Sequence, residues 1–207
     1  ESYLAREFPD YSVRRAFTSQ IIMNHILARD GEKIDNVEQA LERAKKNGVK
    51  ELIVQPTHLM QGKEYDELKE TLDKHKASFE KLELAEPLLG EVGKTAEDVN
   101  ADKEKVATLL VQAAVADSGF DSVQKVGQDR AAFVFLGHGT SHTAAISYSE
   151  MQSAMKKLGY ANVFIGTVEG EPEDTAVEAV IEAVKKAGYK KVTLRPMMVV
   201  AGDHAHN

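Results

Sequence analysis

The chain has 207 residues, which is enough for one large domain or for two small α/β lobes that each bury a core. It contains no cysteine, which excludes disulfides, thiolate metal sites and cysteine nucleophiles, so a metal ion would need histidine, carboxylate or hydroxyl ligands. The formal net charge of −7 and the lack of a basic stripe argue against a nucleic-acid partner.

The apolar runs of the chain are short. No stretch approaches the roughly 18 apolar residues that a membrane span needs. No basic segment followed by an apolar one opens the chain, as it would in a signal peptide. We therefore expect no membrane partner and a cytoplasmic location, and a homo-oligomer is compatible with the sequence.

Hydrophobic spacing and turn residues predict alternating helices and strands in the first part of the chain. The expected helices are residues 1–8, 20–29, 37–46, 65–81 and 97–118. The expected strands are residues 11–17, 51–55 and 82–87, and a glycine-containing loop, 89–94, follows the last of these. The polar segment 127–130 is the expected boundary between two lobes, residues 1–128 and 129–207.

The second part of the chain repeats this alternation. Strands are expected at residues 131–136, 162–167 and 191–194, with helices at 147–158 and 174–187. The strand–helix–strand order predicts an α/β fold with a parallel sheet and right-handed crossovers. A last apolar run begins at Pro196, looks like a buried strand and ends in a polar tip.

An internal repeat links the two parts. The stretch A-K-K-N-G-V-K-E-L-I-V-Q-P, which begins at Ala44, corresponds to V-K-K-A-G-Y-K-K-V-T-L-R-P, which begins at Val184. The offset of 140 stays constant as far as Gly62 and Gly202. We therefore expect two similar lobes with pseudo-two-fold symmetry, each a parallel sheet flanked by helices, whose polar tips converge on a cleft.

The same repeat makes a prediction about the ends of the chain. When the two copies are matched, Glu1 falls inside a helix, so the opening strand of the first lobe is missing. The second lobe stops at Asn207, before the elements that follow Gly62 in the first lobe. We therefore expect both lobes to be truncated versions of those in a longer protein.

Histidine and carboxylate side chains follow three of the expected strands. His138 lies between two glycines after one strand, Glu169 follows a second, and His204 follows the last apolar run. The carboxyl ends of parallel strands form the ligand-binding edge of an open α/β sheet. Two imidazoles and one carboxylate suit cobalt, nickel, iron or zinc and leave coordination positions open. His138, Glu169 and His204 are therefore the predicted metal ligands and catalytic residues.

Other polar residues near these tips have weaker support. His58 and Glu64 form the corresponding tip of the first lobe, where Glu64 matches His204 in the repeat. His142 and His206 are candidates for a supporting role. The G-H-G-T-S segment lacks the lysine and the spacing of a phosphate-binding loop, and Ser141 lacks the glycine pattern of a hydrolase nucleophile.

Five short motifs resemble those of one known family. They are R-A-F-T-S from Arg15, H-L-M-Q-G-K-E-Y from His58, L-G-H-G-T-S-H from Leu136 with G-T-V-E-G-E-P from Gly166, and M-V-V-A-G-D-H-A-H-N from Met198. Together they are similar to the class II chelatases, and most closely to the anaerobic cobalt chelatases that insert Co²⁺ into sirohydrochlorin in cobalamin synthesis. The similarity extends over essentially the whole chain.

This resemblance implies a two-lobe chelatase fold that holds a tetrapyrrole between its lobes. It also implies that His138, Glu169 and His204 bind the metal and that Glu64 is a carboxylate of the cleft. Arg15 is the candidate cation for the substrate carboxylates, and Phe17, Thr18 and His58 are assigned to substrate binding with it.

The implied reaction is metal insertion, in which a histidine or glutamate of the cleft removes the pyrrole N–H protons as a general base. Co²⁺ would be held on ligands loose enough to release it to the ring nitrogens. Two alternatives stay open. The same site could take Fe²⁺, Ni²⁺ or Zn²⁺, because its ligand types do not separate these ions. The chain could also bind metal or tetrapyrrole without turnover.

Overall fold

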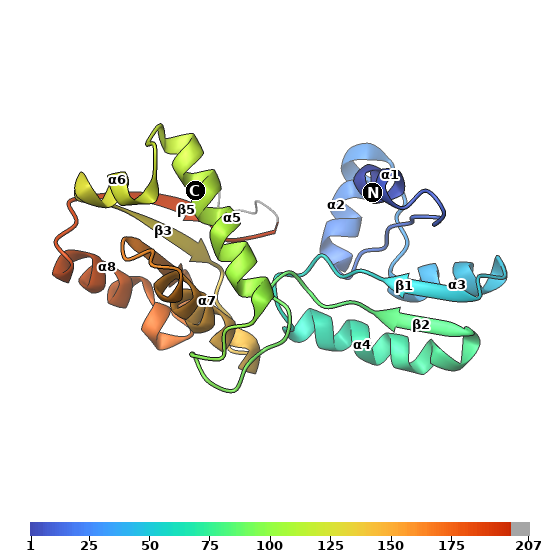
Figure 1. Cartoon of the computed structure of the whole chain (residues 1–207). Coiled ribbons are helices and arrows are strands. Elements are labelled where there is room, and N and C mark those ends of the chain that lie inside the picture. The colour runs from blue at the N-terminus through green and yellow to red at the C-terminus, as the bar shows by residue number, and fades with distance from the viewer. Residues whose placement is uncertain (200–207) are drawn as a thin grey trace. The chain divides into compact units, whose positions relative to one another are not determined.

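The computed structural model describes residues 1–199 and has an α/β fold (Figure 1). Its α-helices are α1 Ser2–Glu7, α2 Gln20–Asp30, α3 Val37–Lys46, α4 Lys63–His75, α5 Ala101–Ser118, α6 Val123–Gln128, α7 Ile146–Lys157 and α8 Val177–Lys186. Its strands are β1 Glu51–Val54, β2 Lys81–Leu84, β3 Ala131–Gly137, β4 Val163–Thr167 and β5 Lys191–Pro196. Short 3₁₀ helices lie at Lys76–Ser78, Thr143–Ala145 and Glu173–Thr175. The predicted α/β class with parallel sheets flanked by helices is confirmed.

The described residues divide into two compact units. Residues 1–55 and 66–85 form the first unit, and residues 56–65 and 86–199 form the second. The expected lobes, 1–128 and 129–207, and the symmetry between them stay predictions. No helix among residues 1–199 is both long and apolar enough to cross a membrane.

The first unit contains a two-stranded parallel sheet in which Glu51 of β1 lies opposite Lys81 of β2. Alternation along each strand turns every second residue toward an apolar cluster. This cluster is built on Leu41 of α3, Leu68 and Leu72 of α4, and Phe79, with Leu52, Val54, Leu82 and Leu84 packed against it. The two helices α3 and α4 are thereby held together by apolar side chains.

The repeat found in the sequence corresponds to one structural element that occurs twice. Helix α3 begins and ends 140 residues before α8, and β1 begins 140 residues before β5. Gly48 and Gly188 end the two helices in the left-handed conformation, with φ of 71° and 81°. In both copies the glycine N–H donates to a lysine carbonyl three residues back, at 2.9 Å and 3.0 Å. The repeated sequence therefore corresponds to a shared helix–turn–strand structure.

The second unit contains a three-stranded parallel sheet with the order β4–β3–β5. Alternate residues of the central strand β3 face opposite layers of helices. Phe133 and Phe135 join the main core with residues of α5 and α7, whereas Val134 packs with residues of α8. This two-sided burial explains why residues 131–136 read as an uninterrupted apolar run. The edge strand β5 is more open, and its Leu194 is 63% exposed.

A buried ion pair joins α5 to α7 in the second unit. Lys103 Nζ lies 3.0 Å from Glu150 Oε2, and both side chains are fully buried. Lys103 also donates hydrogen bonds to the carbonyls of Leu89 at 3.0 Å and Glu91 at 2.6 Å. The other carboxylate oxygen, Glu150 Oε1, accepts the N–H of Gly93 at 2.6 Å. Two helices and the loop 89–94 are therefore tied together by two charged side chains.

Several predicted elements differ from those observed. Residues 11–16 form no strand, and Phe17 makes only an isolated bridge to Asn36, because its N–H bonds to Asp35 without further pairing along the segment. Helix α6, capped by Ser122, was not predicted, and it extends into segment 127–130 as far as Gln128. The helix expected at 65–81 ends at His75, and Phe79 turns into the core. After β5 ends at Pro196, no strand continues through residues 197–199.

We expect Glu150→Gln to lower the free energy of unfolding by about 3 kcal/mol, because it leaves the Lys103 ammonium buried without a counter-charge. Denaturant unfolding of the whole chain measures this loss. The matched control is Lys157→Ala, which breaks the exposed ion pair between Lys157 of α7 and Glu104 of α5. Breaking that pair should cost about 0.2–1 kcal/mol. If both variants lost the same free energy of unfolding, the buried Lys103–Glu150 pair would contribute no more to stability than the exposed pair.

Candidate functional site

Two of the predicted site residues follow neighbouring strands of the second unit. Strands β3 and β4 run parallel, and Gly137 at the end of β3 lies opposite Thr167 at the end of β4. His138 and Glu169 come one and two residues later, so both emerge at the carboxyl edge of the sheet. This is the edge at which open α/β sheets bind ligands.

The structure brings His138 and Glu169 into contact. His138 Nδ1 lies 3.5 Å from Glu169 Oε1, and the backbone N–H of Glu169 donates to the His138 carbonyl at 2.9 Å. His138 Nδ1 also lies 3.3 Å from the Gly139 carbonyl. When Nδ1 carries the proton it can donate to either oxygen, which leaves the lone pair on Nε2. The side chains are 50% and 55% exposed, so both can reach a ligand from solvent.

Gly139 allows the two loops to approach each other. Its φ is +90°, and a Cβ at this position would lie 3.2 Å from Glu169 Cβ and 3.2 Å from the Glu171 carbonyl oxygen. A larger residue would meet both the backbone strain and the neighbouring loop. The glycine after His138 is therefore needed for the contact between imidazole and carboxylate.

Tyr148 of α7 supports this loop from inside the protein, and the sequence analysis did not identify it. Its hydroxyl oxygen accepts the N–H of Gly139 at 3.3 Å, and its ring fills the place where Gly137 would carry a Cβ, 2.1 Å from Tyr148 Cε1. Burial, and to a lesser extent the Glu169 charge, raise the pKa of Tyr148, so the phenol stays neutral. The glycine at position 137 was the feature of the sequence that could have indicated Tyr148, because a glycine at a strand end can leave space for a large neighbouring side chain.

The end of the third strand lies beside this edge. Beyond β5, the N–H of Met197 donates to the Leu136 carbonyl at 2.7 Å, and the Met197 side chain is buried. The chain therefore leaves the sheet next to the end of β3. The predicted ligand His204, with Asp203 and His206, lies outside the described residues.

His58 and Glu64 also belong to the second unit. The His58 carbonyl accepts the N–H of Leu88 at 3.1 Å, which attaches its segment to the loop before α5. Its Nδ1 is buried and has no hydrogen-bond partner. Burial lowers the pKa of His58, and the charge of Glu64 raises it by a smaller amount. His58 is therefore a neutral imidazole near neutral pH.

The remaining predicted residues, Arg15, Phe17 and Thr18, lie in the first unit. The Arg15 guanidinium forms an ion pair with Glu32 and lies 3.7 Å from Glu1 Oε2. Phe17 is half-buried and Thr18 is exposed next to Ser19, the cap of α2. Their predicted contacts with a substrate stay predictions.

The fold and the His138–Glu169 pair define a class, that of open α/β proteins with an imidazole and a carboxylate at the carboxyl edge of a parallel sheet. The family model described as "Cobalt chelatase (CbiK)" matches residues 1–207. This chain therefore belongs to the cobalt chelatase (CbiK) family.

Two curated relatives are similar over nearly all of the chain. The sirohydrochlorin cobaltochelatase of Salmonella typhimurium strain LT2 is 31% identical over 207 residues, which are 100% of this chain and 70% of the relative. The sirohydrochlorin cobaltochelatase CbiKC of Nitratidesulfovibrio vulgaris strain Hildenborough is 30% identical over 200 residues. These are 96% of this chain and 63% of that relative, so the chain spans less than two thirds of the second protein.

We expect Gly139→Ala to destabilise the protein more than Gly170→Ala, by about 1 kcal/mol or more. Both glycines have positive φ, but a Cβ on Gly170 would lie no closer than 4.0 Å to its neighbours, whereas one on Gly139 would press on Glu169. Denaturant unfolding measures the difference. Equal costs for the two variants would contradict the close packing of the two loops.

We expect the pKa of His58 to lie below 6.5, its ordinary value, and Glu64→Gln to lower this pKa further. Histidine NMR signals followed against pH measure both pKa values. Because the unfolded chain binds this proton more readily, the His58 contribution to stability is fully present above pH 6.5 and declines as the pH falls toward the folded pKa. A His58 signal that titrates at or above pH 6.5 would contradict the burial of the ring.

Proposed function

We propose that this chain inserts Co²⁺ into sirohydrochlorin, with His138, Glu169 and His204 as the ligands that hold the metal before transfer. The observation that carries the proposal is the His138–Glu169 pair, an imidazole and a carboxylate 3.5 Å apart at adjacent strand ends. Membership of the cobalt chelatase family and the names of the two relatives support the choice of metal and substrate.

The ligand set suits a protein that must release its metal. Imidazole nitrogen and carboxylate oxygen bind Co²⁺ well, but two or three such ligands leave positions open for the incoming ring nitrogens. The half-exposed side chains of His138 and Glu169 allow hydrated Co²⁺ to exchange water for protein ligands. A closed four-ligand site would hold the ion too firmly to pass it on.

Insertion also requires the removal of protons. One Co²⁺ replaces two pyrrole N–H protons, so the reaction releases two protons for each metal inserted. A neutral histidine or an ionised glutamate of the site accepts these protons as they leave the ring. The Nε2 lone pair of His138 and the Glu169 carboxylate are released as Co²⁺ passes to the ring nitrogens, and these are the groups we assign to proton uptake. The neutral His58 adds no positive charge that would repel the ion.

Substrate binding is assigned to five residues. Sirohydrochlorin carries several carboxylates, and Arg15 is the proposed cation for them, with Phe17, Thr18, His58 and Glu64 as further contacts. The first-unit ion pairs of Arg15 with Glu32 and Glu1 are exposed and weak enough to exchange for a substrate carboxylate. A cytoplasmic location and a homo-oligomer remain part of the proposal.

We expect His138→Asn and Glu169→Gln each to lower kcat/KM by about 100-fold or more, because each removes a ligand or a proton acceptor. The assay mixes purified protein, sirohydrochlorin and Co²⁺ without oxygen and follows the absorbance change of the ring. Parallel runs with Ni²⁺ and Fe²⁺ measure the preference for cobalt.

The control is Glu171→Gln, which changes an exposed carboxylate of the same loop and should leave the rate within about threefold of the parent. If both site variants inserted Co²⁺ at the rate of the parent, the roles proposed for His138 and Glu169 would be refuted. If the parent protein did not exceed the uncatalysed rate, the proposed chelatase activity would be refuted.

A further inference from the structure

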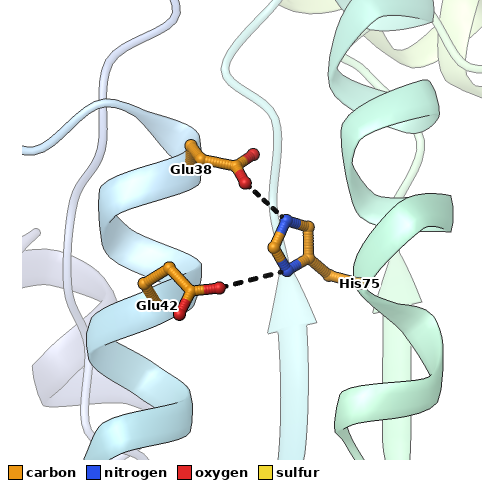
Figure 2. A group of neighbouring side chains, drawn as sticks. All are labelled: Glu38, Glu42 and His75. Atoms are coloured by element: carbon orange, nitrogen blue, oxygen red, sulfur yellow. Dashed lines mark hydrogen bonds and ion pairs between the residues drawn. The ribbon is translucent and has the colours of Figure 1, made fainter.

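A second group of possible metal ligands lies in the first unit. Among residues 1–199, Glu38, Glu42 and His75 form a group whose ligand atoms all lie within 4.8 Å of one another. Figure 2 shows the imidazole of His75, at the end of α4, between the two carboxylates of α3. We propose that these three residues bind a divalent first-row transition-metal ion, in addition to the chelation site proposed above.

The sequence places the two carboxylates on one face of a helix. Glu38 and Glu42 are four residues apart in α3, which brings their side chains one above the other. The start of α3 is fixed by a capping box in which Asn36 and Gln39 bond to each other's backbone. The positions of both carboxylates along the helix are therefore well defined.

Packing brings the histidine to this face. Leu41 of α3 and Leu68 and Leu72 of α4 are buried in one cluster, so the two helices cannot move apart without exposing it. Only 11% of the His75 side chain is exposed, whereas Glu38 is 60% exposed and Glu42 is 56% exposed. The imidazole is thus a fixed ligand and the carboxylates are adjustable ones.

The distances require one small rearrangement. Glu38 Oε1 lies 2.8 Å from Nε2 of His75, and Glu42 Oε1 lies 3.7 Å from Nδ1. One ion uses one ring nitrogen, at about 2.0–2.2 Å, with the carboxylate oxygens at similar distances. Rotation of one exposed glutamate side chain brings its oxygen to the same ring nitrogen as the other.

A competing ion pair sets the strength of binding. Lys45 Nζ lies 2.8 Å from Glu42 Oε1, and a metal ion must displace it. The Lys45 hydrogen bond is also the main reason that the pKa of Glu42 is lowered, so this carboxylate is ionised and ready to bind. His75 must be neutral to act as a ligand. Binding should therefore be of moderate affinity.

The donor set selects the class of metal. One imidazole nitrogen with two carboxylate oxygens suits Zn²⁺, Co²⁺ or Ni²⁺, with water in the remaining positions. Mg²⁺ and Ca²⁺ prefer oxygen ligands alone and gain nothing from the histidine. Co²⁺ is the convenient probe because its visible absorbance changes when imidazole replaces water.

The internal repeat provides a matched control. Glu38 and Glu42 correspond to Glu178 and Glu182 of α8. The spacing of the two glutamates is the same, and both bounds of α8 lie 140 residues after those of α3. The carboxylate pair therefore occurs twice, so the two glutamates alone do not define a site. The group in the first unit is distinguished by His75.

The test is a Co²⁺ titration of the whole chain, followed by calorimetry and visible absorbance. All variants are made in a His138→Asn, Glu169→Gln background, which removes two proposed chelation ligands. We expect His75→Asn to remove one bound ion for each chain. The pair Glu38→Gln, Glu42→Gln should weaken that ion by about tenfold or more, whereas Glu178→Gln, Glu182→Gln leaves it unchanged.

Stability gives a second readout. A metal that binds only the folded chain raises the melting temperature as its concentration rises, and this increase should be absent in His75→Asn. Unchanged Co²⁺ stoichiometry and affinity in His75→Asn would overturn the proposal. A His75→Asn variant that loses stability without any metal-linked change would also overturn it, because the group would then be an ion pair only. The Co²⁺ results do not depend on turnover, so failure of the proposed enzyme leaves them interpretable.

Discussion

The buried ion pair between Lys103 and Glu150 connects the parts of the second unit that carry the proposed chemistry. Lys103 holds the carbonyl of Leu89, whose N–H bonds to the Leu59 carbonyl at 2.9 Å beside His58. Glu150 lies two residues after Tyr148 in α7, and Tyr148 supports the loop of His138. The segments of both histidines are therefore anchored to one charged contact in the core, where an unpaired charge would be costly.

This contact explains why the loop 89–94 is ordered without regular structure. Asn100 caps α5 and donates to the same carbonyls of Leu89 and Glu91 that Lys103 binds. Gly93 offers its N–H to Glu150 and carries no Cβ, which would lie 2.3 Å from the carboxylate. A loop whose polar backbone groups find such partners can pack against an apolar core, as Leu89 and Gly90 do here.

Local patterns were sufficient to predict much of the fold. Helix periodicity and terminal glycines, which are properties of neighbouring residues, predicted α3 at its observed bounds and α8 at 174–187, where the helix spans Val177–Lys186. The position of His138 and Glu169 at the carboxyl edge of the sheet could be predicted because each residue closely follows an expected parallel strand. Residues 11–17 were mistaken for a strand because pairing depends on distant partners. Lys103 and Tyr148 were missed because a lysine in a charged helix is usually exposed, and because the role of a core tyrosine depends on the loop it meets.

The duplicated helix–turn–strand element has a consequence for how the chain folds. Both copies are built from local contacts and can form early, before the long-range pairing of the sheets. The same backbone is compatible with pairing to either partner strand, β2 or β3, and such mispairing is a common source of misassembly. The two copies differ in the side chains of their strands. Thr193 stands where β1 has Ile53, and Arg195 forms an ion pair with Asp117 of α5, a contact available only to the second copy. Polar residues of an exposed edge strand thus contribute to correct strand assignment.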